Sequence, residues 1–338
     1  MSAHTPDEVA AAHLVLDATA APSMHNAQPW RFRYAPSTGT FSLFADTARA
    51  MPHADPTTRG LHIGCGAALF NLRVAAAHLG LRPVIRLLPD PAVPELLATV
   101  RLGVPADVVG GTADPADTAD DLALLYPAIH ERRTSRDPFS DRRVPEEVRQ
   151  ALGAAAHREG ATLAVPTGPH LQTVLNLINS AEGYDHMDPA REAETERWAR
   201  STTDEAAVDG VPQYAFGPLK RGGSAPARDF AGRARVAGRP RADFEDRPQL
   251  ALLSTARDEP ADWLRAGQAL ERVLLVATLH GLSTSFATQA LEWPELRWVL
   301  RDPLSGTGQA QMVVRLGYGP PGPGTPRRPV AHVLVVED

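Results

Sequence analysis

The residues best suited to chemistry gather in two short stretches, and the first lies near the N-terminus. It runs from Ala21 to Phe32 and places Ser23, Asn26 and Gln28 ahead of Pro29-Trp30. Ser and Asn side chains bond nearby backbone and hold tight turns. The residue before a proline is pushed toward extended geometry, which here is Gln28. Taken alone, the pattern indicates a loop that leaves a helix and enters a strand.

The second stretch is Arg132-Arg133-Thr134-Ser135-Arg136-Asp137-Pro138-Phe139. Alternating Arg and hydroxyl side chains suit a phosphomonoester, because planar guanidinium forks and a short donor match its oxygens. Each charge-assisted bond would contribute about 1.5–3 kcal/mol. Arg132-Arg133 alone would better suit a solvated basic helix end. Because Lys220 is the only lysine, any phosphate site in this chain must use arginine.

Regular elements should position the first stretch. A helix should begin at a Thr5 cap, with Pro6 and Glu8 in its first turn, and run to about Thr19. The helix at Gly60–Gly80 is apolar most of the way round, which indicates packing on several sides. The strands expected in this part are Trp30–Tyr34, Thr40–Ala45, Pro83–Leu88 and Leu97–Leu102.

The second part of the chain should begin after an irregular linker, Val104–Asp120, which separates residues 1–103 from 121–338. Residues 184–246 interrupt the regular alternation, with one helix-like piece at 190–200, and an insertion of this length is typical of a lid or binding loop. The other expected helices are 121–132, 145–157, 170–181 and 261–280, and the expected strands are 161–165, 249–254, 311–318 and 330–336.

The two parts contain a repeat. Gly66–Leu81 aligns without gaps with Gly267–Leu282, and each helix is followed by a strand ending in Val-Arg-Leu-Gly. A Gly-capped helix followed by a strand is common, so chance similarity stays open. Duplication would place two related halves in one chain, as in a two-fold dimer.

The two stretches described first, Ala21–Phe32 and Arg132–Phe139, resemble segments of the nitroreductase superfamily. Pro22-Ser23-x-x-Asn26-x-Gln28-Pro29-Trp30 is similar to the loop that lies along the isoalloxazine ring of FMN in that family. Arg132, Thr134 and Arg136 match its phosphate pattern, Arg-Arg-Ser-x-Arg followed by Phe and a Pro-Glu helix start. Thr replaces the usual Ser here, and Asp137-Pro138 inserts one residue before the Phe.

Two further segments resemble the family. Leu282–Ala290 is similar to the passage that presents a backbone N–H to flavin N5, with Thr288-Gln289 in place of the frequent Glu-Gly. The segment Pro326–Pro329 resembles the closing segment whose basic residues reach the phosphate, and Arg327 and Arg328 are equal candidates. The resemblance therefore implies these cofactor-binding residues: Pro22, Ser23, Met24, Asn26, Gln28, Arg132, Thr134, Arg136, Thr288, Gln289, Arg327 and Arg328.

The resemblance implies an α+β fold in which two pseudo-symmetric halves mimic a nitroreductase dimer. Each half lacks one of the two motifs, so one FMN site per chain is expected, as in the Acg branch of the family. The implied activity is hydride transfer from NAD(P)H through flavin N5 to a nitroaromatic, quinone or enone-like acceptor. No catalytic side chain is assigned, since hydride transfer itself needs no acid or base.

Two other functions stay open. The protein could sequester FMN as a stress protein with little turnover, because residues 184–246 are long enough to close a cleft, with Tyr214–Gly223 over the flavin face. It could also be a flavin-free interaction protein, which would require the arginine segment to be ordinary surface. Further association of the fused pair is not decided by the sequence.

Composition argues against several other classes of function. The net charge is −6, which offers no basic surface for nucleic acid, and no long uncharged apolar run predicts a membrane span. A single cysteine, Cys65, fits a reducing cytoplasm. No metal site is expected, because His25, His53, His62 and Cys65 match no tight ligand spacing.

Three other motifs are set aside. No strand precedes Gly60, Gly64 and Gly66, as a dinucleotide loop would require. Ser23 lacks the Gly-x-Ser-x-Gly context of a hydrolase nucleophile. Trp293 and Trp298 are expected to be packing residues.

Overall fold

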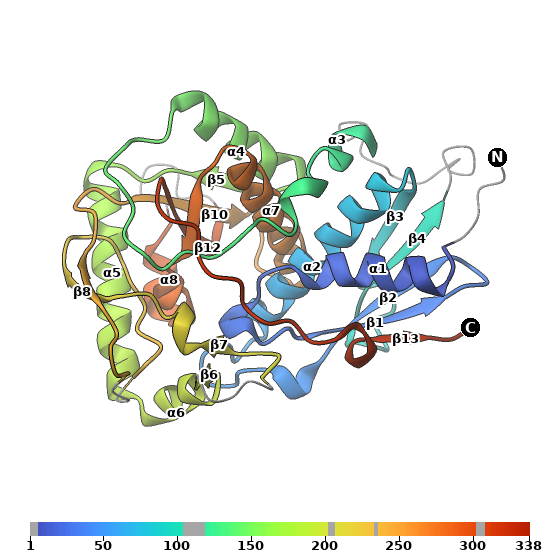
Figure 1. The fold of residues 1–338 in the computed structure, drawn as a ribbon, viewed down its shortest axis with the longest axis horizontal. Helices are drawn as coiled ribbons and strands as arrows, with labels where there is room; N and C mark the ends of the chain where they lie inside the picture. The colour runs from blue at the N-terminus through green and yellow to red at the C-terminus, as the bar shows by residue number, and fades with distance from the viewer. Residues whose placement is uncertain (1–5, 104–118, 202–206, 233–235, 302–307) are drawn as a thin grey trace.

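Two larger β-sheets, each with its own helices, lie side by side in the computed structural model (Figure 1). The structure describes residues 6–103, 119–201, 207–232, 236–301 and 308–338. The predicted linker falls almost entirely on residues outside these ranges, as does Thr5.

The first sheet has the strand order β13-β1-β2-β4-β3. Trp30, Phe32 and Tyr34 alternate inward along β1 while Arg31 and Arg33 face outward, so the strand buries one face against the helices. The elements of this lobe are α1 (Glu8–Thr19), η1 (Met24–Asn26), β1 (Trp30–Ala35), β2 (Thr40–Ala45), η2 (Thr47–Arg49), α2 (Arg59–His78), β3 (Arg82–Leu87), β4 (Leu96–Gly103), η6 (Val330–His332) and β13 (Leu334–Val336).

The second sheet has the order β11-β12-β10-β5, and all its neighbours pair antiparallel. The elements around it are α3 (Ala119–Ala123), η3 (Tyr126–Ala128), α4 (Glu146–Arg158), β5 (Thr162–Ala164), α5 (Gly168–Met187), β10 (Gln249–Thr255), α7 (Pro260–Leu279), β11 (Ser283–Phe286), η5 (Gln289–Glu292), α8 (Pro294–Val299) and β12 (Gln309–Gly317).

The two sheets repeat one topology. Each begins with a helix and strand (α1-β1 and α4-β5), continues with a strand and long helix (β2-α2 and β10-α7), and ends with an antiparallel pair (β3-β4 and β11-β12). In spatial order β3-β4-β2-β1 corresponds to β11-β12-β10-β5, and β13 is an added edge. This order agrees with the duplication that the sequence repeat favours.

The long helices α2 and α7 meet where the repeat aligns two glycines. A Cβ on Gly66 would lie 2.3 Å from the carbonyl oxygen of Leu264, and one on Gly267 would lie 2.1 Å from that of Ile63. Ile63 and Leu264 are themselves equivalent positions in the repeat. Such reciprocal contact between equivalent residues is what a two-fold axis produces.

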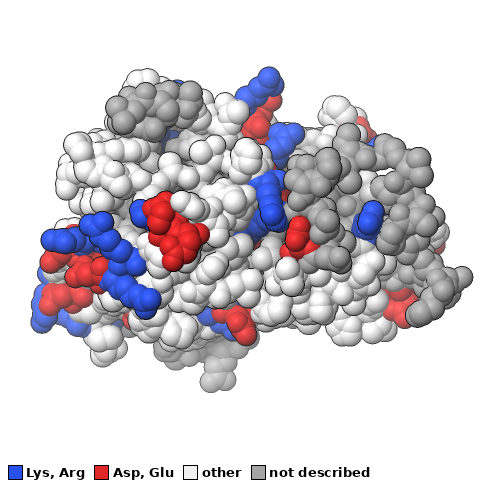
Figure 2. All heavy atoms as spheres, turned by 90° about the horizontal axis from the view of Figure 1, so that it is seen from above, with Lys and Arg blue, Asp and Glu red and all other residues white. Residues whose placement is uncertain are grey.

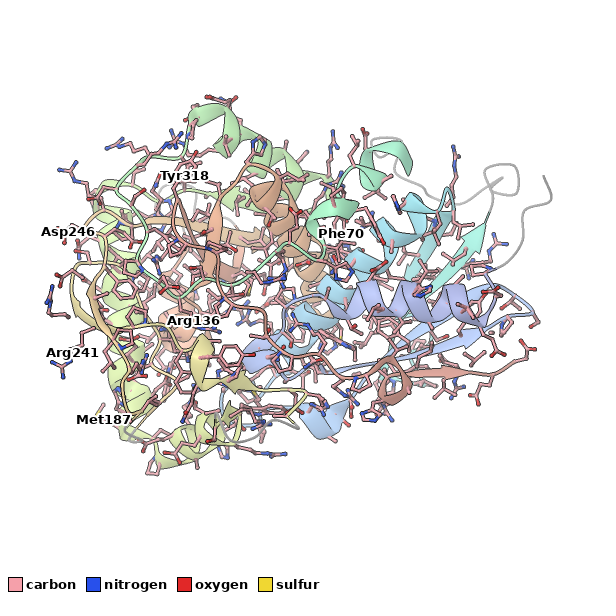
Figure 3. The ribbon with its side chains drawn as sticks, viewed as in Figure 1. Phe70, Arg136, Met187, Arg241, Asp246 and Tyr318 are labelled. Atoms are coloured by element: carbon pink, nitrogen blue, oxygen red, sulfur yellow. The ribbon has the colours of Figure 1, made fainter. Side chains whose placement is uncertain are left out.

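The described residues of 188–246, here called the covering segment, pack across the second lobe and reach the first. Its described elements are α6 (Pro189–Arg197), β6 (Ala199–Arg200), β7 (Val211–Pro212), η4 (Gln213–Ala215), β8 (Leu219–Gly222) and β9 (Arg241–Asp243). Side chains on its outer surface, such as Arg241, lie at the edge of the molecule, whereas Arg136 lies in the interior (Figure 3).

Several predicted boundaries are wrong. Asp7 rather than Thr5 caps α1, because its side chain accepts a bond from the Ala10 N–H. The helix expected over 121–132 is split into α3 and η3, and α5 continues to Met187, so Tyr184 belongs to it. The list of expected strands also lacked β11.

The end of the chain also differs from the prediction. Only 334–336 of the strand expected over 330–336 forms, and it pairs parallel with β1 in the first sheet. The segment assigned to the second half therefore completes the sheet of the first. Residues 318–329, here called the tail, cross between the lobes to reach it (Figure 1).

Two surface features complete the fold. Trp293 packs against the core beside α5, but Trp298 is 67% exposed, so its predicted packing role is wrong. On the face in Figure 2, cationic and anionic side chains are mixed. Among the described residues α2 alone is apolar and long enough to span a membrane, and 83% of its apolar window is buried inside the protein, as in a core helix.

Candidate functional site

A cavity of about 540 Å³ lies between the two lobes. One wall is formed by residues 21–29, here called the N-terminal loop, and by the start of α2. The other is formed by residues 132–139, here called the arginine segment, and by β11 and β12. The covering segment and the tail close it. Nine of the twelve predicted cofactor-binding residues line it: Pro22, Ser23, Met24, Asn26, Arg132, Thr134, Arg136, Thr288 and Arg327.

The N-terminal loop is held in an unusual backbone conformation. His25, Asn26 and Gln28 all have positive φ, 48°, 57° and 53°, so Gln28 is left-handed rather than extended as predicted. Ser23 Oγ accepts a bond from the Gln28 N–H at 2.8 Å, which closes the turn. Left-handed non-glycine residues cost energy and persist where the surroundings fix them, often at functional sites.

Asn26 ties this loop to both covering elements. Its Nδ2 donates to the carbonyls of Gly210 in the covering segment, at 2.9 Å, and Pro326 in the tail, at 3.1 Å. Its Oδ1 accepts from Arg327 at 3.0 Å. Asn26 therefore bonds distant backbone rather than its own turn, and three separate segments meet at this side chain.

Arg132 forms the back wall of the cavity. Its Nε lies 3.5 Å from Glu271 of α7, whose side chain is fully buried, and its Nη2 donates to the Ala20 carbonyl. Its Nε and Nη1 have no hydrogen-bond partner among the described residues. Burial lowers the pKa of Arg132 and raises the pKa of Glu271, and the attraction between the two opposes both shifts.

Thr134 and Arg136 continue from Arg132 along the edge of the second sheet. Thr134 forms a bridge with Thr284, and the Ser135 N–H donates to the Thr284 carbonyl at 2.8 Å. The tail crosses here at Gly322, where a Cβ would lie 2.1 Å from the Thr134 carbonyl oxygen. The arginine segment is therefore fixed between β11 and the tail.

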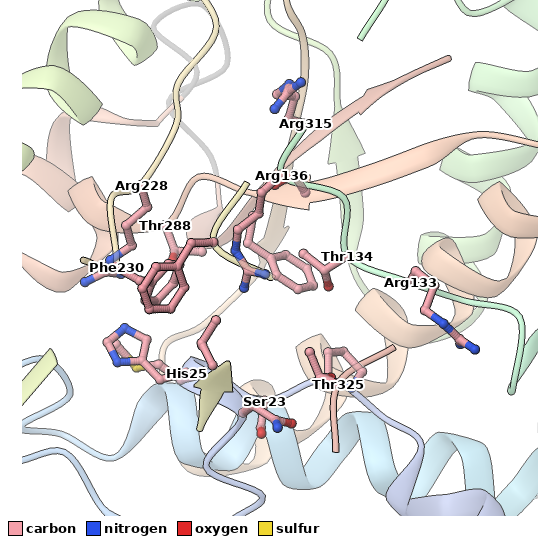
Figure 4. Close-up of a pocket in the computed structure, with 18 of the residues that line it drawn as sticks. Ser23, His25, Arg133, Thr134, Arg136, Arg228, Phe230, Thr288, Arg315 and Thr325 are labelled. Atoms are coloured by element: carbon pink, nitrogen blue, oxygen red, sulfur yellow. The ribbon is translucent and has the colours of Figure 1, made fainter. Parts of the chain in front are cut away.

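Arg136 points into the cavity from above, beside Phe230 (Figure 4). Its Nη1 donates to the Ala215 carbonyl at 2.9 Å, and its guanidinium carbon lies 4.8 Å from the Phe230 ring centroid. No carboxylate pairs with it among the described residues. Burial, with repulsion from Arg228, lowers the pKa of Arg136 to about 10. A desolvated cation without a counter-ion favours an anion in this cavity.

The structure separates the two tail arginines. Arg327 lines the cavity and donates to the carbonyls of Thr19 and Ala20; burial and repulsion from Arg132 lower its pKa to about 9. Arg328 turns away and pairs with Asp46 at 3.3 Å. Arg327 is thus the tail cation that faces the cavity.

Three predicted residues do not line the cavity. Arg328 is one, and Gln28 is another: the Gln28 side chain donates to the Val208 carbonyl and accepts from the Arg328 N–H, so it joins loop, covering segment and tail. Gln289 is buried and donates to Glu182 at 3.1 Å. These side chains support the cavity wall from outside.

Several lining residues were missed, mainly from the covering segment. Phe216, Arg228 and Phe230 close the cavity, and Arg228 reaches across to pair with Glu292 at 2.5 Å. Of Tyr214–Gly223, predicted to lie over the ligand, residues 216 and 218–220 line the cavity. Tyr214 itself is 59% exposed and donates its hydroxyl to the Gly324 carbonyl in the tail. The covering segment carries no motif that would have identified these residues.

His25 was also missed as a site residue. It is 6% exposed and lines the cavity, and its ring lies edge-on to Phe230 at 5.3 Å between centroids. Neither ring nitrogen has a hydrogen-bond partner among the described residues. Burial lowers the pKa of His25 well below 6.5, and Arg228 and Arg136 add to the shift. The imidazole is therefore neutral at neutral pH.

The other considered chemistries find no support here. Cys65 is buried in α2, and burial raises the pKa of its thiol far above the usual range. In the described part of the chain, no three His, Cys, Asp or Glu side chains gather as a metal site would require. The cavity instead has Arg132 and Arg327 in its wall and a second pair of arginines, Arg136 and Arg228, beside the aromatic ring of Phe230. This lining suits a planar ligand with an anionic tail.

Comparison with known proteins gives consistent matches. The Nitroreductase family model matches residues 129–318. "Putative NAD(P)H nitroreductase Rv3131" of Mycobacterium tuberculosis H37Rv is 33% identical, over 99% of this chain and 93% of its own. "Putative NAD(P)H nitroreductase acg" of the same organism is 32% identical, over 94% and 92%. Among solved structures, the "putative nitroreductase from anabaena variabilis atcc 29413" is 13% identical, over 94% of this chain and 90% of its own, with a TM-score of 0.47.

Proposed function

Because this chain belongs to the nitroreductase family, we propose that it binds one FMN between its lobes and acts as an FMN-dependent oxidoreductase. The observation that carries the proposal is Arg136, a desolvated cation inside the cavity with no carboxylate partner among the described residues. Arg132 adds two buried nitrogens that make no hydrogen bond to the described residues, although its Nε also lies 3.5 Å from Glu271. An anionic, phosphate-bearing planar ligand would give Arg136 a negative partner and would accept hydrogen bonds from Arg132.

The residues present fit FMN. Arg132, Thr134 and Arg327 would hold the phosphate, since guanidinium forks and a hydroxyl suit its oxygens. Pro22, Ser23 and Met24 would lie along the ring from the opposite lobe, and Phe216 and Phe230 supply apolar surface at the closed end. The backbone at Thr288-Gln289 would donate toward the ring. Arg136 would face its electron-rich edge, where a fixed cation stabilises added negative charge.

When bound, FMN would supply hydride transfer from NAD(P)H to an organic acceptor, and the protein would supply position and electrostatics. Nitroaromatics, quinones and enone-like metabolites are the acceptor classes we propose. The covering segment would exclude water, and the arginines would fix the cofactor. None of this requires a second protein, a nucleic acid or a membrane.

We infer a single site per chain. At the position equivalent to the ligand loop, α4 and β5 are joined by only three residues, Glu159–Ala161. Glu159 there pairs with Arg73 at 2.5 Å and Arg272 at 2.8 Å, which fills the equivalent place with an internal ion cluster. We accordingly propose that residues 1–103 and 121–338 represent two fused halves of which only one interface kept a cofactor site.

The test of the cofactor is the visible spectrum of the purified protein. We expect a flavin spectrum, released into the supernatant on heat denaturation and identified as FMN by chromatography. NADPH and NADH should then bleach it under anaerobic conditions, at rates that define the preferred donor. A protein that stays colourless after incubation with FMN and desalting would contradict the proposal.

The alternative, a protein that stores FMN with little turnover, is favoured by the closure of the cavity. The covering segment is fastened to η5 by Arg228–Glu292, to η2 of the first lobe by Arg49–Asp209 at 2.7 Å, and to the tail by Tyr214. If these contacts persist in solution, a nicotinamide ring cannot approach the cofactor face. The two functions differ only in how often the segment opens.

Replacing residues 214–223 by a Gly-Ser linker should distinguish them. We expect FMN to remain bound and its reduction by NADPH to become at least tenfold faster, because Phe216 and Leu219 would no longer cover the ring. Stopped-flow absorbance measures the rate, and dithionite, which is small, should reduce both proteins alike. An unchanged NADPH rate in a protein that retains FMN would show that this stretch does not limit access.

A further inference from the structure

A buried imidazole without partners distinguishes the closed end of the cavity. His25 is more than nine-tenths buried, yet neither of its ring nitrogens bonds any described residue. A neutral imidazole carries one donor and one acceptor, and leaving both unmade in the protein interior is costly. The left-handed backbone at His25 adds to this cost. A ligand that forms hydrogen bonds with the ring nitrogens of His25 would offset both costs.

The position of His25 indicates which ligand this is. Thr134, which would hold the phosphate, and its neighbour Arg133 lie toward one side of the cavity, whereas His25 lies at the other side with Arg228 and Phe230 (Figure 4). His25 belongs to the body and Phe230 to the covering segment, and their rings are in contact. A molecule that enters when the covering segment moves would therefore contact His25 at the point where the covering segment packs on the N-terminal loop.

The charges around His25 define the chemistry of that molecule. Arg136 and Arg228 are close enough to depress its protonation, so the local potential is positive and favours electron-rich atoms. Phe216 and Phe230 add flat apolar walls. A planar aromatic compound with a nitro, quinone or carboxylate oxygen matches both features.

We propose that His25 binds the electron acceptor by donating its ring N–H to an sp² oxygen of a planar, oxygen-bearing aromatic molecule held beneath Phe230. The proposal rests on the proposed function, since it assigns the acceptor site of the same cavity. A neutral donor suits this role, because reduction places negative charge on the acceptor oxygen, and a fixed N–H stabilises that charge.

The test uses terephthalate, a planar dicarboxylate that resembles 4-nitrobenzoate but cannot be reduced. Its dissociation constant for the FMN-loaded protein is measured by isothermal titration calorimetry, and FMN occupancy is measured by absorbance for every variant. His25→Phe keeps the ring shape without the donor, and His25→Gln restores a donor. His157→Phe, on the exposed surface of α4, is the matched control.

We expect His25→Phe to weaken terephthalate binding about tenfold with FMN occupancy unchanged, His25→Gln to stay within about threefold of the original, and His157→Phe to have no effect. The KM for 4-nitrobenzoate should follow the same order. Equal terephthalate affinity in His25→Phe, or no binding by the original protein at millimolar concentration, would overturn the assignment. Loss of FMN in His25→Phe would also overturn it, because His25 would then serve the cofactor. A protein without FMN would overturn the proposed function first.

Discussion

Gly267→Ala should destabilise the protein by about 3 kcal/mol or more, measured by urea denaturation followed by circular dichroism. The new Cβ would lie 2.1 Å from the Ile63 carbonyl oxygen and 2.8 Å from the Cα of Gly66. Both atoms belong to backbone, so no side chain can rotate to make room and α2 must move away from α7. Gly66→Ala should have a similar effect, with its Cβ 2.3 Å from the Leu264 carbonyl oxygen.

Gly153→Ala is the matched control for this prediction. Gly153 lies inside α4, and apart from the backbone of its own helix turn no described atom lies within 4 Å of its Cβ position. The same substitution there should stabilise the protein by about 0.5–1 kcal/mol, because alanine loses less backbone entropy in a helix. If Gly267→Ala unfolds at the same urea concentration as the original protein, the two helices do not approach as closely as the structure shows.

Arg136→Ala should weaken FMN binding about 10- to 100-fold while leaving the fold intact. The cation faces the proposed ligand and pairs with no described carboxylate, so its removal leaves no buried acid unpaired. Arg132 is a poorer test, because its removal would leave fully buried Glu271 alone and confuse cofactor loss with unfolding. Thr134→Val should have a smaller effect in the same direction, since it removes one neutral hydroxyl.

The measurement is equilibrium dialysis of FMN, with thermal unfolding of the apoprotein recorded in parallel. Arg241→Ala is the control, since this arginine of the covering segment points outward (Figure 3). It should retain FMN fully. Full FMN occupancy in both Arg136→Ala and Thr134→Val would contradict the placement of the phosphate-bearing ligand.

Local patterns in the sequence predicted the parts of the site that depend on local rules. The apolar periodicity of α2 and α7, the glycines that end them and the spacing of Arg132, Thr134 and Arg136 are all properties of short windows. The repeat that contains Gly66 and Gly267 predicted two fused halves, and the close approach of these two residues is consistent with that idea, which stays a prediction.

The rest depends on contacts between distant residues, which no short window contains. Arg327 and Arg328 are adjacent, and only the path of the tail decides that the first faces the cavity and the second pairs with Asp46. Gln28 matches the family motif, yet its side chain donates to the Val208 carbonyl and accepts from the Arg328 N–H. His25 stands out only because the surrounding protein leaves its nitrogens without partners.

The path of the tail also constrains how the protein is made. Residues 323–325 and 327 line the cavity, and Leu334–Val336 pair with β1, roughly three hundred positions earlier in the chain. During translation the β1 edge of the first sheet therefore stays unpaired until nearly all of the described chain has left the ribosome. Contacts so distant in sequence slow folding, because the chain must close a very long loop before they form. FMN can be enclosed only after the tail is in place, so we expect cofactor loading to follow synthesis of the tail.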